Sequence, residues 1–155
     1  MRKINLVGLM CLWPIAATPA DKFQPLNVKT GLWESSSTMI EEGEPAGKAV
    51  SSKHCITQEQ VDNAQQALEP WARAGSKGRQ GTTVTIVKST SSELLIHLDA
   101  SGSGVNGSGD VHIQVISPVE VTADSHSELT FMGKTVKMKS EIRDRWIGPN
   151  CGSVE

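Results

Sequence analysis

Residues 135–146 have the sequence TVKMKSEIRDRW, in which apolar and charged side chains alternate with a period of two. One side of an extended chain would carry Val136, Met138, Ser140, Ile142 and Trp146, and the other Lys137, Lys139, Glu141, Arg143 and Arg145. Successive side chains of a β-strand point to opposite faces, so this pattern predicts a strand with one face on a core and one in water. No other segment of the chain has so regular a pattern.

Further strands are expected on the N-terminal side of this segment. They are predicted at residues 30–40, 48–54, 82–86, 94–98, 110–116, 119–123 and 129–132. Short turns between successive strands favour an antiparallel meander, because parallel strands need a crossover connection at every step. We therefore expect a mainly β (α+β) fold, a curved antiparallel β meander or partial barrel of about seven strands packed on one α-helix.

The one predicted helix follows Thr57, which has Gln60 three residues later, the spacing of a capping box. Its apolar stripe would consist of Val61, Ala64, Leu68 and Trp71. Pro70 lacks a backbone donor and disfavours a helical residue before it, so the helix is expected to end or kink there. Residues 75–81 then form a basic, glycine-rich link.

Residues 1–20 have the order of a secretory signal peptide. Arg2 and Lys3 form a basic start, residues 4–17 carry no charge, and small residues precede Asp21. The apolar run is shorter than the roughly 20 residues that cross a bilayer. We predict cleavage of residues 1–20, leaving residues 21–155 as a single β-rich extracytoplasmic domain with no transmembrane segment. A lipoprotein is disfavoured, because Met10 rather than a small residue precedes Cys11.

The charge balance argues against nucleic acid as a partner. The chain has 15 Lys and Arg against 17 Asp and Glu, and loss of Arg2 and Lys3 with the signal peptide leaves 13 basic residues and a net charge of −4. Binding of phosphates requires a basic surface, which this balance does not favour.

The mature chain would keep two cysteines, Cys55 and Cys151. In an oxidising compartment a disulfide between them is the simplest interpretation. It would close a loop of about 96 residues and contribute roughly 4 to 5 kcal/mol in the chain-entropy model. A reactive thiol, or a metal site that includes His54, is the alternative, although no C-x-x-C or H-x-x-x-H spacing supports a metal.

The glycine-rich stretch 102–107, GSGVNG, matches the G-x-G-x-x-G pattern of dinucleotide-binding loops. That pattern is informative only between a strand and a helix, whereas a strand is predicted to follow here, so we interpret it as a hairpin loop. The flanking Asp99 and Asp110 lack the spacing of a known calcium loop. We therefore expect no cofactor-binding or metal-binding residues, and no cofactor.

Catalytic residues are not expected either. His97 and His112 should share the face opposite the aliphatic residues, where they could approach each other if their strands are neighbours. No serine lies in a G-x-S-x-G motif. Glu141 and Asp144 are interpreted as charges on the outer face. The prediction is that the protein is not an enzyme.

Three tryptophans, Trp33, Trp71 and Trp146, provide most of the aromatic surface of the mature chain, which has no tyrosine. Aromatic side chains bury about 150 to 250 Å² each, so these residues are expected to anchor the core. The alternative is that one or two of them line a pocket for an apolar ligand between the sheet and the helix.

Three short motifs occur together in this chain: Gly31-Leu-Trp33-Glu34, Cys55-Ile-Thr57 before the helix, and Trp146-Ile-Gly148-Pro-Asn-Cys151-Gly152 at the end. Their order and spacing resemble those of domain-of-unknown-function family 3617, a family of small exported bacterial proteins. The resemblance covers nearly the whole mature chain and implies a periplasmic or secreted location in a bacterial cell envelope. It also implies that Cys55 and Cys151 occupy the family's cysteine positions, but it provides no activity.

The hypothesis that the sequence favours is a non-enzymatic periplasmic domain that binds a small apolar ligand, or a segment of an envelope protein, on the concave face of its sheet. The alternative is a structural or protein-interaction module of the cell envelope, and an uncharacterised enzyme is the third hypothesis.

The signal peptide and the disulfide can be tested together by intact mass. After expression of the full chain in a bacterium, we expect a protein that begins at Asp21 and gains no label from an alkylating reagent until it is reduced. Reduction should then expose two thiols. A mass that includes residues 1–20 would contradict export with cleavage, and two labelled thiols in unreduced, denatured protein would exclude the bridge.

Overall fold

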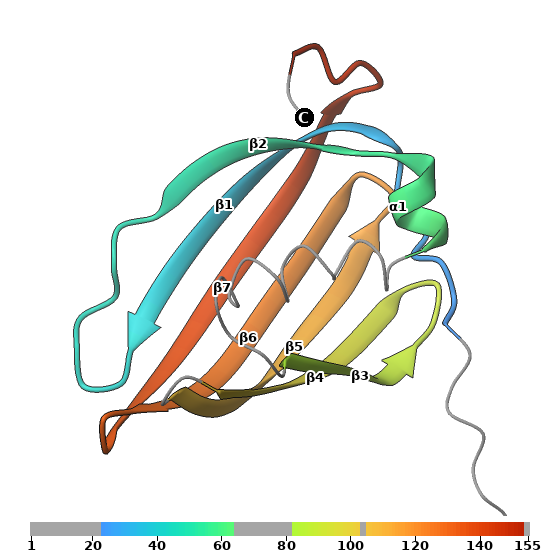
Figure 1. The fold of residues 1–155 in the computed structure, drawn as a ribbon. Coiled ribbons are helices and arrows are strands. Elements are labelled where there is room, and N and C mark those ends of the chain that lie inside the picture. Colours follow the sequence, from blue (N-terminus) through green and yellow to red (C-terminus); the bar gives the residue numbers. More distant parts are fainter. Residues whose placement is uncertain (1–22, 64–81, 103–104, 154–155) are drawn as a thin grey trace, which may run out of the picture.

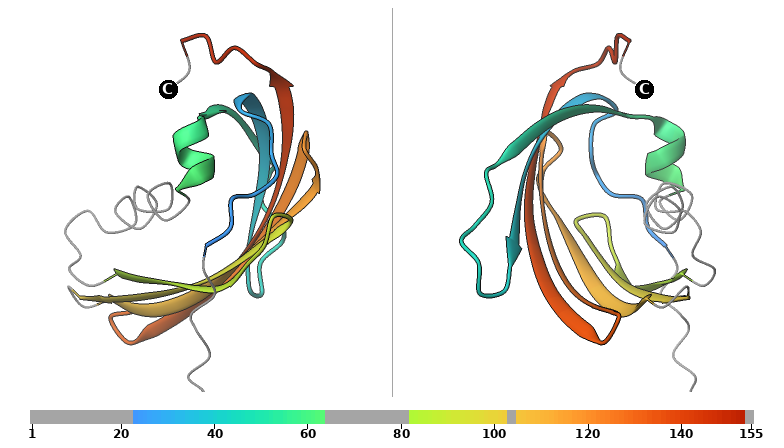
Figure 2. Two further views of the ribbon diagram at one scale, coloured as in Figure 1. Left: turned by 90° about the vertical axis from the view of Figure 1, so that its right-hand side faces the viewer. Right: turned by 60° about the vertical axis from the view of Figure 1, so that its left-hand side comes forward.

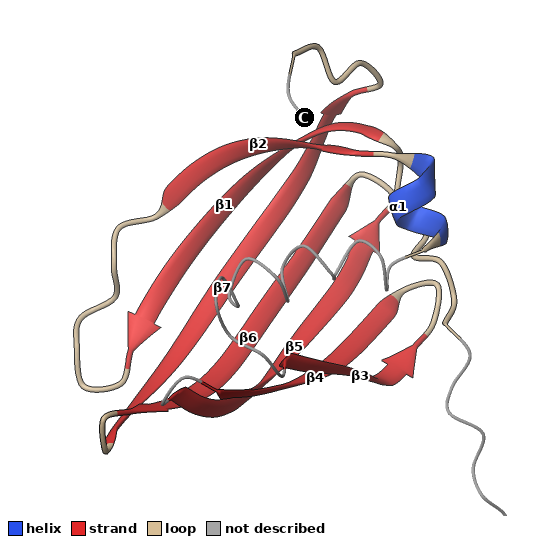
Figure 3. Ribbon diagram, viewed as in Figure 1, coloured by secondary structure: helices blue, strands red, loops and turns tan. Residues whose placement is uncertain are grey.

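A computed structural model describes residues 23–63, 82–102 and 105–153. It shows a single curved sheet of seven antiparallel strands with a short helix at one end (Figure 1; Figure 3). The elements are β1 (Gly31–Glu41), β2 (Val50–Ile56), α1 (Gln58–Asp62), β3 (Thr82–Ser89), β4 (Glu93–Gly102), β5 (Val105–Ser117), β6 (Glu120–Phe131) and β7 (Lys134–Gly148). The predicted fold class, a mainly β protein with a curved antiparallel sheet, is confirmed. The predicted signal peptide lies outside the described residues.

The strand order is β2-β1-β7-β6-β5-β4-β3. Strands β3 to β7 form the expected meander, in which each strand pairs with the next along the chain. The hairpin of β1 and β2 joins this meander through β1 and β7, which are far apart in the sequence. Strands β2 and β3 do not pair with each other, so the sheet is curved but not closed into a barrel (Figure 2).

The strand with the strict alternation behaves as predicted. Along β7 the side chains of Val136, Met138, Ser140, Ile142 and Trp146 are half-buried, and those of Lys137, Lys139, Glu141, Arg143 and Arg145 are exposed. Its turn from β6 is one residue earlier than expected. Met132 and Gly133 both have positive φ, 50° and 77°, which matches a two-residue type I′ hairpin turn.

Strand β6 is longer than the sequence suggested. The predicted strands 119–123 and 129–132 are parts of one continuous strand, Glu120–Phe131. The sequence gives no strand signal in its middle, because Ser125 and Ser127 occupy the inward positions there and the apolar half of the alternation is missing. Both serines are nevertheless half-buried, as inward positions should be.

Helix α1 begins with the predicted capping box. The Thr57 side chain accepts a hydrogen bond from the Gln60 backbone N–H at 3.3 Å, and the Thr57 backbone N–H donates to Gln60 Oε1 at 2.9 Å. The described helix is five residues long and buries none of its side chains. The rest of the predicted helix, with Leu68 and Trp71, and the link at 75–81 lie outside the described residues.

The core of the described chain lies at one end of the sheet, which we call the closed end: the end where β1 begins and β7 finishes. The buried apolar side chains are those of Trp33, Leu94, Ile96 and Val121. Residues 23–30 cross this end and are held by backbone hydrogen bonds from Asn27 N–H to Ser91 O (2.7 Å) and from Lys29 N–H to Pro118 O (2.9 Å).

Gly31 marks the point where this N-terminal segment enters β1. Its φ is +124°, and a Cβ atom there would lie 2.3 Å from the carbonyl oxygen of Gly148 on β7. Only glycine combines that backbone conformation with so close an approach. Gly31 therefore allows the first and last strands to meet at the closed end.

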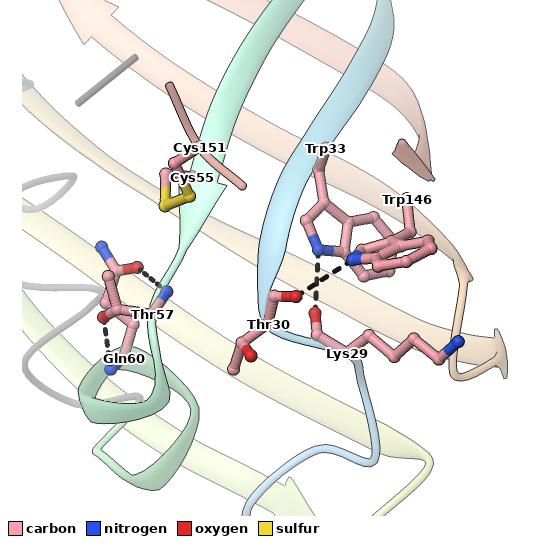
Figure 4. The surroundings of a disulfide bond; sticks show 8 residues. All are labelled: Lys29, Thr30, Trp33, Cys55, Thr57, Gln60, Trp146 and Cys151. Carbon is pink, nitrogen blue, oxygen red and sulfur yellow. Dashed lines mark hydrogen bonds between the residues drawn. A yellow bond between two sulfur atoms is a disulfide. The ribbon is translucent and has the colours of Figure 1, made fainter. Parts of the chain in front are cut away.

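The predicted disulfide is present. Cys55 at the end of β2 is bonded to Cys151, with a Cα–Cα distance of 5.4 Å and a sequence separation of 96 residues. It ties the segment that follows β7 to the edge strand of the sheet, near the capped start of α1 (Figure 4).

Removal of this bridge should destabilise the domain. We expect Cys55→Ala combined with Cys151→Ala to lower the free energy of unfolding by about 2–5 kcal/mol, because the unfolded chain regains the freedom of a long loop. Urea unfolding monitored by tryptophan fluorescence measures the loss. A reductant should destabilise the wild type but not the double variant, and equal stability of wild type and variant would contradict a stabilising bridge.

Candidate functional site

The concave face of the sheet has apolar and small side chains along its whole length. Cross-strand register places its middle residues together: Ser35 and Ser37 on β1, Ile142 and Ser140 on β7, Ala123, Ser125 and Ser127 on β6, Gly109, Val111 and Ile113 on β5, Leu94, Ile96 and Leu98 on β4, and Val84 and Ile86 on β3. Figure 2 shows the curvature that makes this surface concave. It is the site that the sequence predicted for an apolar ligand.

Small residues occupy the centre of this face. The hydroxyl oxygens of Ser125 and Ser140 are 2.7 Å apart and hydrogen-bonded across β6 and β7. On β5, a Cβ atom at Gly107 would lie 2.5 Å from the Leu129 side chain, and one at Gly109 would lie 3.0 Å from Ser127 Cβ. Backbone carbonyl oxygens of β6 would be as close or closer, with Glu128 O 2.5 Å from a Cβ at Gly107 and His126 O 2.8 Å from one at Gly109, so the two glycines allow β5 and β6 to approach closely.

Burial decreases from the closed end of the concave face to the opposite end, which we call the open end. Most aliphatic side chains between the two ends are half-buried. At or near the open end, four large apolar residues are exposed: Met39 (65%), Val50 (62%), Phe131 (54%) and Met132 (83%). The concave face is therefore covered at one end and accessible at the other.

The tryptophans differ in their surroundings (Figure 4). Trp33 is completely buried, and its indole N–H donates to Lys29 O at 2.9 Å, so its ring is part of the core. Trp146 lies opposite it on β7, is half-buried, and donates to Thr30 O at 3.0 Å. The Lys29 ammonium lies 4.6 Å from the centroid of the Trp146 ring. Trp71 lies outside the described residues.

Asp144 lies within the concave face, between its two ends, so the predicted position on the outer face is wrong. It shares the inner side of β7 with Ile142 and Trp146. Its side chain is 20% exposed, and its Oδ2 atom is 3.8 Å from His54 Nε2 on β2. Its Oδ1 atom is buried and has no hydrogen-bond partner within residues 23–63, 82–102 and 105–153. The alternation of β7 predicts this inward position, because residue 144 lies two positions from residues 142 and 146, which both face inward.

The convex face carries a band of histidines and carboxylates on β4, β5 and β6. His97 Nδ1 is 2.7 Å from Asp110 Oδ1, and its Nε2 is 3.3 Å from Asp99. His112 Nε2 is 2.8 Å from Glu93 Oε1, and Lys88 Nζ donates to the other carboxylate oxygen, Glu93 Oε2. The strands of His97 and His112 are neighbours, as the sequence allowed, but each imidazole has carboxylate partners of its own.

These contacts shift two pKa values. The hydrogen bond to Asp110 raises the pKa of His97 above its ordinary value, and the charge of Asp99 acts in the same direction. Hydrogen bonds from Lys88 and then from His112 lower the pKa of Glu93. Within the described residues, no group of three or more histidine, cysteine or acidic side chains is arranged to hold a metal ion.

The glycine-rich stretch contributes to a shallow depression rather than to a nucleotide site. Gly102 ends β4 and Gly107 lies in β5, so a hairpin connects the two strands where a dinucleotide loop would require a helix. The depression holds about 350 Å³, is open to solvent and is lined by Asp99, Ala100, Ser101, Asn106, Gly107, Ser108, Glu128 and Thr130. The concave face remains the stronger candidate for a binding site.

The fold and site define a class: a small domain built on one curved, unclosed antiparallel sheet, with a disulfide at one end and an apolar concave face. The chain belongs to the protein family described as "Protein of unknown function (DUF3617)", which matches residues 28–151.

Comparison with curated proteins gives no match. Among solved structures, the chain is similar to the S-type phycobiliprotein lyase CPES from Guillardia theta, with 12% sequence identity and a TM-score of 0.41 over 77% of this chain and 89% of that one. This likeness is too distant for any property of that protein to be transferred. No helix within the described residues combines the length and hydropathy needed to span a membrane.

The pairing of His97 with Asp110 predicts a pH-dependent contribution to stability. Because the folded-state pKa of His97 is raised, the stabilisation is fully present below the unfolded-state pKa and is lost as pH rises through the folded value. The stability difference between wild type and Asp110→Asn should therefore be larger at pH 5.5 than at pH 8.5. Urea unfolding at both pH values measures it.

An NMR titration of the imidazole protons provides the control. Asp110→Asn should lower the titration midpoint of His97. Asp124→Asn, on β6 next to the strand of Asp110, should leave that midpoint unchanged. A His97 midpoint that is the same in wild type and Asp110→Asn would contradict the assigned cause.

Proposed function

We propose that this chain is an exported, non-enzymatic protein of the bacterial cell envelope, periplasmic or secreted, that binds a small and predominantly apolar ligand on the concave face of its sheet. The observation that carries the proposal is the gradient of burial along that face. The apolar side chains at the closed end are buried against the protein itself, and those toward the open end are not.

The half-buried apolar side chains of the concave face can contribute free energy to ligand binding. Each CH₂ group removed from water contributes about 0.8 kcal/mol, so half-buried aliphatic side chains on a concave surface can stabilise an apolar ligand. The side chains of Ser125, Ser127 and Ser140 are shorter than the aliphatic side chains of the neighbouring strands, so they leave the most room for a ligand on this face. Ligand sites of this kind are concave and mostly apolar, with a few polar groups that fix orientation.

Export is supported by the order of residues 1–20 and by the disulfide, since a bridge of this kind persists in oxidising compartments. A binding role rather than catalysis is supported by the distribution of polar groups, because most of the histidines and carboxylates lie on the convex face. The ligand would therefore meet a surface dominated by apolar and hydroxyl groups.

A second candidate function, a protein-interaction module, is favoured by the two edge strands, β2 and β3, neither of which pairs with a further strand among the described residues. Strand β3 has a bulge between Ile86 and Lys88, a device that discourages edge pairing. Strand β2 pairs with β1 in an unbroken register and presents Val50 at an exposed position. An extended segment of an envelope protein could add to β2 as a further strand. Protein that binds no apolar probe would favour this function.

Binding of a homologous series of alkyl alcohols tests the first proposal. With the mature domain, measured by displacement of the neutral dye N-phenyl-1-naphthylamine, affinity should rise about two- to fourfold for each added CH₂ group, as expected for burial of the chain. Native mass spectrometry should show a single bound molecule. Absence of dye binding together with a spectrum of bare protein would contradict the proposal.

A pair of tryptophan substitutions places the ligand on one face. Ala123→Trp should abolish dye binding because Ala123 lies at the centre of the concave face between Ile113 and Ile142. Thr122→Trp, one residue earlier and on the convex face, should leave binding unchanged. Circular dichroism establishes that both variants are folded, and equal dye binding by both would place the ligand elsewhere.

A further inference from the structure

Asp144 is isolated among the charges of the sheet. Along the concave face of the described strands, Glu41 and Lys134 lie at the open end, and between the two ends the acidic side chain is that of Asp144. Its cross-strand neighbours are Ser35 on β1 and Val121 on β6, and Val121 is only 9% exposed. A carboxylate in such surroundings loses hydration that its neighbours do not replace.

The partners of Asp144 leave it incompletely satisfied. His54 approaches Oδ2 at 3.8 Å, which is beyond hydrogen-bonding distance, and Oδ1 has no hydrogen-bond partner among the residues that the structure describes. A buried acceptor without a donor costs free energy, more so when it belongs to a charged group. The carboxylate torsion is soft, so rotation can present either oxygen to a donor that enters from the concave face.

We infer that Asp144 recognises the polar end of the ligand and that this end carries a protonated amine. The inference rests on the proposed function, because it assigns an orientation to a ligand on the concave face. An ammonium group supplies an N–H donor, which the carboxylate lacks. It also carries the opposite charge. A ligand that ends in a carboxylate or phosphate would instead place like charges together.

The orientation follows from the position of Asp144 along β7. It lies two residues from Trp146 and the closed end, whereas the apolar side chains of Ile142, Met138 and Val136 lead from it to the open end. An alkyl chain attached to an amine held at Asp144 would follow these residues outward. The ligand class is therefore a cationic amphiphile with one amino group and one hydrocarbon chain.

The test compares three probes of equal chain length: dodecylamine, dodecanol and dodecanoate. Affinities are measured at pH 7 below the micellar concentration by displacement of N-phenyl-1-naphthylamine from the mature, disulfide-bonded domain. We expect wild type to bind dodecylamine at least tenfold more tightly than dodecanoate. Asp144→Asn should weaken dodecylamine binding tenfold or more and leave dodecanol within twofold, because charge-assisted hydrogen bonds are the strong ones.

Two variants control the interpretation. Glu141→Gln removes the same charge from the same strand but on the exposed convex face, and it should leave all three affinities unchanged. His54→Gln removes the imidazole that approaches Asp144 Oδ2, so the preference for dodecylamine should be retained or increased. Loss of that preference in His54→Gln would contradict the assignment to Asp144.

Thermal unfolding of Asp144→Asn should occur at or above the wild-type temperature, because the substitution removes an unsatisfied charge.

The outcomes separate the inference from the proposed function. Equal affinity for the amine and the carboxylate, or an amine affinity that Asp144→Asn does not change, would overturn the inference while the concave face remained a binding site. Failure of all three probes and of the dye to bind would overturn the proposed function itself. If Asp144→Asn loses dodecylamine binding but keeps dodecanol binding, and the two control variants keep the preference for dodecylamine, the result supports both the inference and the proposed function.

Discussion

The pairing of the first strand with the last is the constraint on which the rest of the structure depends. Strands β3 to β7 each pair with the next, so they could form from local hairpins, but β1 and β2 join the sheet only through β7. The register places Trp33 opposite Trp146, and Gly31 permits the close approach to Gly148. The entropy of closing a loop of about a hundred residues opposes this pairing. Burial of Trp33 and the Cys55–Cys151 bridge act at the same end, and both offset this entropic cost.

This constraint also makes the two ends of the sheet different. The residues that precede β1 must cross the closed end to reach it, and there they bond to Ser91 and Pro118 and accept the indole N–H groups of Trp33 and Trp146. No corresponding contacts cross the open end within the described residues, where Met39 and Phe131 remain exposed. Burial is thus concentrated where the first and last strands meet, and on the concave face the exposed apolar side chains lie toward the other end.

The sequence predicts elements that have a local signal and misses relations that do not. The alternation of β7 and the capping box of Thr57 follow from residue types at fixed spacing, and the disulfide follows from the number of cysteines left in the mature chain. All three are present. The partnership of β1 with β7 has no local signature, since it depends on how the meander curves. Strand β6 was divided because serines take its central inward positions. The ion pairs of His97 and His112 required the register of β4 with β5, which no spacing within one strand specifies.

Asp144 shows why a candidate site can be hidden within a pattern that was otherwise interpreted correctly. In the run Arg143-Asp144-Arg145 the acidic residue has two basic neighbours, and a surface ion pair is the obvious interpretation. The alternation that creates the strand separates these charges, because both arginines are exposed on the convex face while the carboxylate points the other way. Its flanking cations therefore cannot neutralise it directly.

Folding sequences tend to be consistent at every level, and the exceptions are expected at functional positions. A charged residue at an inward position of the most regular strand, with one oxygen unsatisfied, is such an exception, and the chemistry that would satisfy it must come from outside the described sheet.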